Sequence, residues 1–118
     1  MFCDLLWADP VPDEESSTTE DFKPNDDRDT SFFYGRRAVK KLLDANHLIS
    51  ILRAHQVQVD GYKMHRFHDG PASKASTTAV SQIDFPSVIT IFSAPNYCGS
   101  YDNKGAYFTI EKGTVRVK

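Results

Sequence analysis

One strongly β-branched run, residues 87–92, most constrains how this chain can fold, because it contains Val-Ile-Thr-Ile without interruption. Such side chains favour a pleated strand over a helix. The short apolar run at residues 48–52 predicts a fully buried strand, and the alternation of apolar and polar side chains at residues 61–67 predicts a half-buried one. Two more strands are expected at residues 106–110 and 115–117, so the C-terminal half is predicted to be largely antiparallel sheet.

The residue pattern of the N-terminal half predicts one helix between two strands. Residues 31–34 have strand character and end at Gly35, after which helical spacing places four apolar residues on one face: Ala38, Val39, Leu42 and Leu43. Residues 11–29 are crowded with Pro, Ser, Thr, Asp and Glu and predict a loop. Residues 68–84 are poor in large apolar side chains and predict a flexible insertion in a hairpin loop. A single domain of mixed α/β (α+β) class is expected over residues 1–118.

Composition excludes several classes of protein. The 118 residues are 40% hydrophobic, which is enough for the core of one small globular domain. Fourteen Lys and Arg stand against sixteen Asp and Glu, with no long run of either sign, so neither a nucleic-acid partner nor a membrane partner is expected. The two cysteines, Cys3 and Cys98, have neither disulfide nor metal spacing. That usage favours a reducing compartment, the cytoplasm, with the nucleus as the alternative.

His55 is the first candidate for chemistry. It follows the predicted strand at residues 48–52, and ligands of sheet-based enzymes collect just past the ends of strands. A neutral imidazole is also the commonest metal ligand in proteins. A histidine that is simply hydrogen-bonded within the structure is the alternative interpretation.

Two arginines are ambiguous in a similar way. Arg28 lies in the acidic segment 25–29, and its guanidinium has the shape of a phosphate ligand as well as the charge for an ordinary surface ion pair. Arg53 stands near His55 in the sequence and is either functional or a structural ion-pair partner of Asp9 or Asp60.

The turn at residues 93–99 is the third candidate. Tyr97 is placed to project its hydroxyl into a cleft, while Asn96 and Asp102 are suited to hold the loop through side-chain to backbone hydrogen bonds. Cys98 is a reactive thiol if a cation lies beside it and inert packing otherwise. A well-formed hairpin turn without further function is the alternative.

Four groups of residues, taken in this order, resemble the PPP family of serine/threonine protein phosphatases. They are Leu6-Trp7-Ala8-Asp9-Pro10, Asn25 to Arg28 before an aromatic strand, Leu52-Arg53-Ala54-His55-Gln56 with Asp60-Gly61-Tyr62, and Ser93-Ala94-Pro95-Asn96-Tyr97-Cys98-Gly99 with Asp102-Asn103-Lys104-Gly105. Their order and spacing match across nearly the whole chain. Residues 50–55, 62–64 and 85–92 are most similar to the calcineurin catalytic-subunit branch, whereas Cys98-Gly99 is the turn of other branches.

The resemblance implies a fold, a reaction and partners. The fold is the C-terminal portion of a calcineurin-like metallophosphoesterase β-sandwich, with one clear helix and mainly antiparallel strands. The reaction is hydrolysis of phosphoserine and phosphothreonine esters of a phosphoprotein substrate by water that two divalent or transition-metal ions (Mn, Fe or Zn) activate. The implied partners are the N-terminal part of the catalytic domain and a regulatory subunit.

The same resemblance implies roles for particular residues. His55 matches a metal-ligating histidine, Arg28 matches an arginine that binds the substrate phosphate, and Tyr97 matches a tyrosine that overhangs the metal centre. Cys98 matches a cysteine near which natural toxins bind in some members. The remaining matched positions are expected to support the site structurally: Arg53, Asp9 and Asn96.

Other family motifs are absent. Gly-Asp-x-His-Gly, Gly-Asp-x-Val-Asp-Arg-Gly and Gly-Asn-His-Glu occur nowhere in the 118 residues. We therefore expect part of a catalytic domain that supplies at most one metal ligand and is inactive alone. The family usually has Gly after the phosphate-binding arginine, where this chain has Asp29, whose carboxylate would oppose a phosphate. The alternatives are a non-catalytic binding module or a truncated product, either of which retains the phosphatase sheet.

Overall fold

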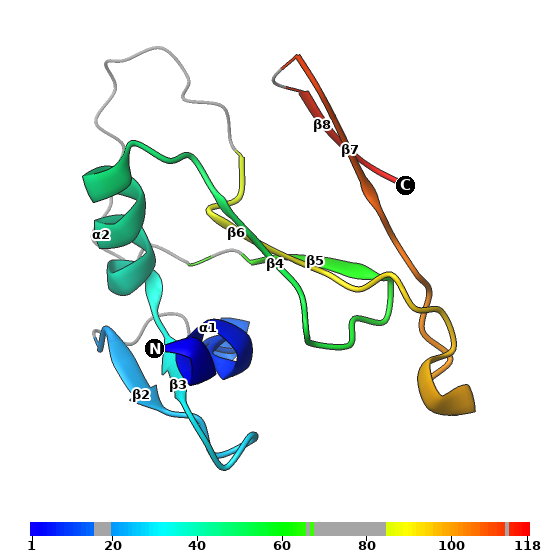
Figure 1. Cartoon of the computed structure of the whole chain (residues 1–118), viewed down its shortest axis with the longest axis horizontal. Helices are drawn as coiled ribbons and strands as arrows, with labels where there is room; N and C mark the ends of the chain where they lie inside the picture. Colours follow the sequence, from blue (N-terminus) through cyan, green and yellow to red (C-terminus); the bar gives the residue numbers. More distant parts are fainter. Residues whose placement is uncertain (16–19, 66, 68–84, 113) are drawn as a thin grey trace. The chain divides into compact units, whose positions relative to one another are not determined.

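The computed structural model describes residues 1–15, 20–65, 67, 85–112 and 114–118 (Figure 1). Within them the chain divides into two compact units. The first unit comprises Met1–Ile51 and His65–Val88, and the second comprises Leu52–Met64 and Ile89–Lys118. The predicted insertion at residues 68–84 lies outside the described residues, and the single domain expected over residues 1–118 stays a prediction.

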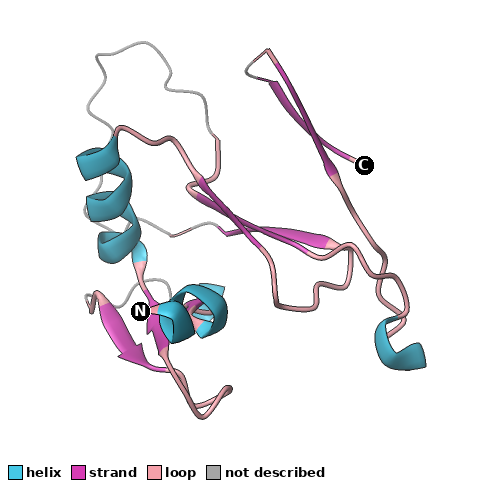
Figure 2. Ribbon diagram, viewed as in Figure 1, coloured by secondary structure: helices cyan, strands magenta, loops and turns pink. Residues whose placement is uncertain are grey.

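Short strands, two α-helices and two 3-10 helices are joined by loops in the described part of the chain (Figure 2). In chain order the elements are α1 Phe2–Trp7, β1 Asp9–Pro10, a 3-10 helix Asp13–Glu15, β2 Phe22–Pro24, β3 Phe32–Tyr34, α2 Arg36–Asn46, β4 Ile51–Arg53, β5 Tyr62–His65, β6 Val88–Ile91, a 3-10 helix Tyr97–Gly99, β7 Phe108–Glu111 and β8 Thr114–Val117. The predicted mixed α/β class is confirmed. Neither of these two α-helices is both long and apolar enough to cross a membrane.

The first sheet lies in the first unit and consists of β1, β3 and β2, with β3 in the centre. β1 runs parallel to β3, and β2 runs antiparallel to it. The register places Asp9 and Lys23 on opposite sides of Phe33, so the three side chains share one face of the sheet. The Lys23 ammonium lies 5.0 Å from the centre of the Phe33 ring. This face therefore includes a buried carboxylate, Asp9, that requires partners.

The β-branched run forms the centre of the second sheet. Its strand order is β4-β6-β5, and in β6 the residues Val88, Ile89 and Thr90 are all fully buried. Burial of a central strand explains the uninterrupted β-branched pattern, because both of its faces contact protein. β7 and β8 form a separate antiparallel hairpin in the second unit (Figure 1).

Two sequence-based expectations were wrong in part. Residues 11–29 were predicted to be loop, but they include a 3-10 helix and β2, whose backbone pairs with β3. The run at residues 48–52 was predicted to be a fully buried strand, but the strand begins at Ile51 and the side chain of Ile49 is 80% exposed. Both errors have one physical cause: a strand depends on its pairing partner, which local residue patterns do not contain.

The core of the first unit forms where α2 meets Val88. Val39 and Leu43, one helical turn apart, are buried and cluster with Val88. Three partly buried side chains pack against this cluster: Tyr34, Ile51 and Phe67. Leu42 was predicted on the same helix face, but it is about half exposed. The buried face of α2 is therefore narrower than the distribution of its apolar residues predicts.

A Schellman motif ends α2. The backbone N–H of Leu48 donates to the carbonyl of Leu43 at 2.9 Å, and that of His47 donates to Asp44 at 3.4 Å. His47 consequently adopts a left-handed conformation, with φ 54°. Glycine is the usual residue here because it has no Cβ to clash with the backbone.

Replacing His47 with glycine is therefore expected to raise the free energy of unfolding by about 1 kcal/mol, since it removes the left-handed strain. Urea denaturation followed by circular dichroism measures the change. Lys40→Gly is the matched control, because it introduces glycine into the right-handed interior of α2 and should lower stability by a similar amount. Loss of stability in His47→Gly would contradict the assigned role of the left-handed cap.

Candidate functional site

Arg28 is anchored to a buried carboxylate in the first unit. Asp9 is only 1% exposed, and its Oδ2 accepts a hydrogen bond from Arg28 Nε at 2.9 Å. A second, longer contact joins Arg28 Nη2 to Asp9 Oδ1 at 3.5 Å. Of the two roles left open by the sequence, the ion pair is therefore present, although its partner is buried rather than on the surface. The Arg28 side chain itself remains 23% exposed.

The local backbone explains how Arg28 reaches Asp9. The backbone N–H of Asn25 donates to the carbonyl of Ser31, and that of Arg28 donates to the carbonyl of Asn25, both at 3.2 Å. Asp29 and Ser31 both have positive φ, 51° and 61°, which reverses the chain within a few residues. The segment between β2 and β3 thus folds into a closed loop that contains Arg28.

Sequence reasoning missed two residues around Arg28. The Nδ2 of Asn25 donates to Asp9 Oδ2 at 3.0 Å, and the Trp7 ring lies 5.6 Å from the guanidinium carbon of Arg28. At that distance the guanidinium is attracted to the aromatic face. The available signal was the placement of Trp7 and Asn25 in the same matched segments as Asp9 and Arg28.

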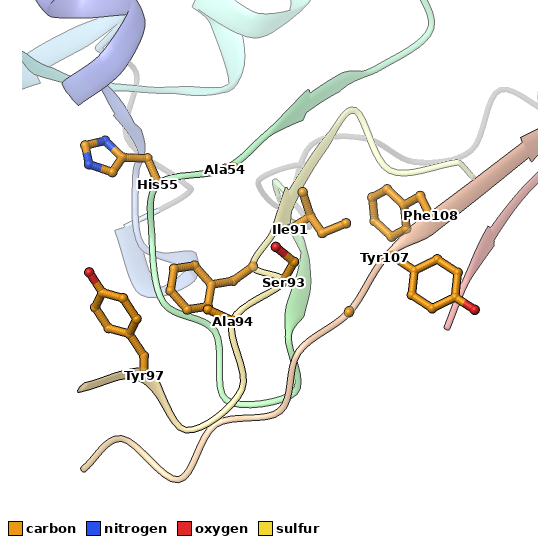
Figure 3. A pocket seen from close by; sticks show the side chains of 10 residues that line it. Ala54, His55, Ile91, Ser93, Ala94, Tyr97, Tyr107 and Phe108 are labelled. Carbon is orange, nitrogen blue, oxygen red and sulfur yellow. The ribbon is translucent and has the colours of Figure 1, made fainter. Parts of the chain in front are cut away.

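His55 and Tyr97 both line one cavity of about 340 Å³ in the second unit. Figure 3 shows the imidazole of His55 and the phenol of Tyr97 at the same end of this cavity, with the Tyr97 hydroxyl directed toward the His55 side. His55 is exposed and has a positive φ of 72°. The rest of the lining is mostly apolar: Ala54, Ile91, Phe92, Ser93, Ala94, Ala106, Tyr107 and Phe108. The cavity therefore combines one imidazole and one phenol with a hydrophobic wall.

Close backbone packing builds the wall of this cavity. Phe92 N–H donates to the carbonyl of Gly61 at 2.7 Å, and Ala106 N–H donates to the carbonyl of Phe92 at 3.1 Å. Gly61 has φ +80°, and a Cβ added to it would lie 2.6 Å from the backbone nitrogen of Ala106. Only glycine permits the chain to pass so closely at this point.

A buried amide organises the turn that contains Tyr97. Asn103 accepts a hydrogen bond from the Tyr97 backbone N–H at 2.9 Å and donates to the carbonyls of Ala94 at 2.8 Å and Lys104 at 2.9 Å. These bonds come from Asn103 rather than from the predicted Asn96 and Asp102. Asn96 and Asp102 instead adopt left-handed backbone conformations, with φ 45° and 49°.

The aromatic ring of Tyr97 is held from two sides. Its centre lies 5.2 Å from that of Phe92 in an edge-to-face arrangement and 5.9 Å from that of Tyr101. Cys98 follows on the same 3-10 turn, where it is exposed and has a positive φ of 54°. Cys98 is therefore exposed on the same turn as Tyr97.

Arg53 braces the segment that leads to His55. Its Nη1 donates to Gln56 Oε1 at 2.9 Å and contacts Thr90 Oγ1 of β6 at 3.5 Å. Asp60, one of its two expected ion-pair partners, accepts a hydrogen bond from Lys104 at 2.8 Å. That hydrogen bond raises the pKa of the Lys104 ammonium above its ordinary value.

Over the described ranges, no three His, Cys, Asp or Glu side chains are grouped so that they could hold a metal ion. The ligand expected from the sequence is a single imidazole, His55, whereas a two-metal centre needs several nitrogen and oxygen ligands. The described residues therefore do not fit such a centre by themselves.

Comparison with known proteins shows what the chain is similar to. No protein-family model matches the chain. The chain is, however, 37% identical to the serine/threonine-protein phosphatase 2B catalytic subunit A1 of Saccharomyces cerevisiae and 31% identical to catalytic subunit A2 of the same yeast. Both matches cover 100% of this chain. Along its whole length the chain is therefore similar to part of these two serine/threonine-protein phosphatase catalytic subunits. The predicted resemblance to PPP-family phosphatases is thereby confirmed.

A solved structure extends the likeness to the fold. The structure of a protein serine/threonine phosphatase from Saccharomyces cerevisiae, with similarity to human phosphatase PP5, matches with a TM-score of 0.63 and 20% identity. The match covers 95% of this chain and 31% of that phosphatase chain. The predicted phosphatase fold is therefore confirmed for a segment. The chain spans only 21% and 22% of the lengths of these two yeast catalytic subunits.

Replacing Asn103 with alanine is expected to lower the free energy of unfolding of the chain by about 1–3 kcal/mol, because it leaves buried backbone groups without partners. Thermal and urea unfolding measure the loss. Asn46→Ala is the matched control: Asn46 makes one exposed side-chain bond, to Leu42, and its removal should change stability by no more than about 0.5 kcal/mol. Equal effects of the two substitutions would show that Asn103 does not organise the Tyr97 turn.

Proposed function

We propose that this chain forms part of a metal-dependent protein phosphatase that hydrolyses phosphoserine and phosphothreonine esters in phosphoprotein substrates. The observation that supports it most is the likeness to two phosphatase 2B catalytic subunits, which extends over 100% of the chain. A regulatory subunit is a proposed partner, and a cytoplasmic location stays a prediction.

Arg28 is the proposed phosphate-binding group. A planar guanidinium presents paired N–H donors that match the oxygens of a phosphate, and it stays charged at every relevant pH. Its anchored and partly exposed position supports this role, because Asp9 restricts its motion while solvent still reaches the side chain. A pre-organised cation of this kind stabilises the charge that develops during phosphoryl transfer.

Tyr97, Cys98 and His55 have different proposed roles. The Tyr97 hydroxyl is proposed to donate a hydrogen bond near the reacting group, and its packing against Phe92 supports this by restricting the ring. Cys98 is the proposed contact for inhibitors on the same turn. His55 is the proposed metal ligand of this chain, and the remaining ligands of the two ions are attributed to parts of the catalytic domain outside it.

The activity test uses a chimera. The chain replaces the corresponding segment of the yeast phosphatase 2B catalytic subunit A1, and hydrolysis of a phosphoserine peptide is measured with Mn²⁺. We expect the chimera to be active, the isolated chain to be inactive, and His55→Ala to reduce chimera activity at least roughly a hundredfold by removing a metal ligand. His47→Gly is the control histidine substitution and should leave activity unchanged. Full activity of His55→Ala in the chimera would refute the metal role.

Asp29 offers a test of the phosphate role of Arg28. Asparagine tolerates the left-handed backbone of Asp29 but has no charge, so Asp29→Asn removes a repulsive carboxylate without changing the turn. We expect phosphate to bind the isolated chain roughly threefold more tightly at low salt, with the gain lost at high salt. Calorimetric titration measures the affinity. Asp44→Asn on α2 also removes an exposed carboxylate and should have no effect; equal effects of the two changes would reject local repulsion by Asp29.

A further inference from the structure

Asn25 occupies a central position in the Arg28 loop. It is 2% exposed, and its Nδ2 donates both to Asp9 Oδ2 at 3.0 Å and to the Trp7 carbonyl at 3.4 Å. Its backbone bonds also close the loop through Arg28 and Ser31. One buried residue therefore connects the end of α1, the carboxylate on β1 and the loop that contains Arg28.

These bonds determine how the carboxylate faces Arg28. Oδ2 of Asp9 accepts from Asn25 Nδ2 at 3.0 Å and from Arg28 Nε at 2.9 Å. The Asn25 amide therefore restricts rotation of the Asp9 carboxylate. The fixed carboxylate in turn determines which edge of the Arg28 guanidinium pairs with it. The contacts of Nε and Nη2 are made on one edge of Arg28, and the covalent geometry of a guanidinium points Nη1 away from that edge.

Trp7 restricts the remaining freedom of Arg28. An ion pair along one edge still allows the guanidinium plane to tilt, whereas an aromatic face 5.6 Å from its central carbon favours a fixed plane. Trp7 is 37% exposed and the Arg28 side chain is 23% exposed, so both residues of this contact are partly accessible to solvent.

We propose that Asn25 and Trp7 are positioning residues that hold the Arg28 guanidinium ready for a phosphate oxyanion. Asn25 acts through the carboxylate of Asp9, and Trp7 acts through its ring. An arginine side chain that is already ordered loses less conformational freedom when an anion binds, so its affinity is higher. The proposal rests on the proposed phosphate role of Arg28, but its test does not require phosphatase activity.

The chain contains its own reporter for this test. Trp7 is its only tryptophan, so its fluorescence should respond when inorganic phosphate binds beside it. Nuclear magnetic resonance of the Arg28 Nε–H group provides a second readout, because the hydrogen bond to Asp9 should slow its exchange with water. We expect phosphate to change both signals in the unaltered 118-residue chain.

Asn25→Ala is expected to weaken phosphate binding roughly tenfold and to accelerate exchange of the Arg28 Nε–H group. Asn46→Ala is the matched control, since it removes an asparagine with a single exposed side-chain bond. The control should keep the affinity and exchange rate of the unaltered chain. A purely structural role for Asn25 would change the melting temperature without changing either readout in the folded protein.

Trp7→Leu keeps the proposal testable if Asn25→Ala does not fold. Its phosphate affinity is measured through the Arg28 resonance alone and is expected to fall several-fold. The proposal is overturned if the unaltered chain does not bind phosphate at Arg28, or if a folded variant at either position binds phosphate as tightly as the unaltered chain. An inactive chimera whose Arg28 still depends on Asn25 would instead reject the proposed enzyme function and leave the positioning role intact.

Discussion

Burial of the Asp9 carboxylate governs the arrangement of the first unit. A charged group that is 1% exposed must be compensated by hydrogen bonds and opposite charge, and Asn25 and Arg28 supply both. The loop between β2 and β3 consequently folds back toward β1. Because β1 and β2 both pair with β3, this loop and β1 belong to the same small sheet region. The same interaction orients the cation that is proposed to meet a substrate phosphate.

The second unit uses a neutral group for a similar purpose. Asn103 bonds the backbone on both sides of the Tyr97 turn, and Gly61 allows the neighbouring backbone to approach without a clash. The result is a cavity whose lining includes one imidazole and one phenol. In both units, therefore, a buried amide holds the segment that carries the candidate functional residue.

Local patterns predicted the elements whose stability is mainly local or whose burial is complete. The i, i+4 pair Val39 and Leu43 correctly indicated α2, and the β-branched run correctly indicated the central strand β6. β2 was missed because a three-residue edge strand in a polar segment exists through its pairing with β3. The exposure of Ile49 was missed because apolar character alone does not specify which neighbours cover a residue.

Residue types and their order were sufficient to indicate the phosphatase family, the main helix and the candidates Arg28, His55 and Tyr97. Tertiary structure decided that Arg28 pairs with Asp9, nineteen positions away, and that Asn25 and Trp7 complete its surroundings. It likewise selected Asn103 over Asn96 for the Tyr97 turn. The physical reason is that a buried polar group forms hydrogen bonds with whichever partners the folded backbone brings near it. Those partners can be far apart in the sequence, so the local pattern of residues does not reveal them.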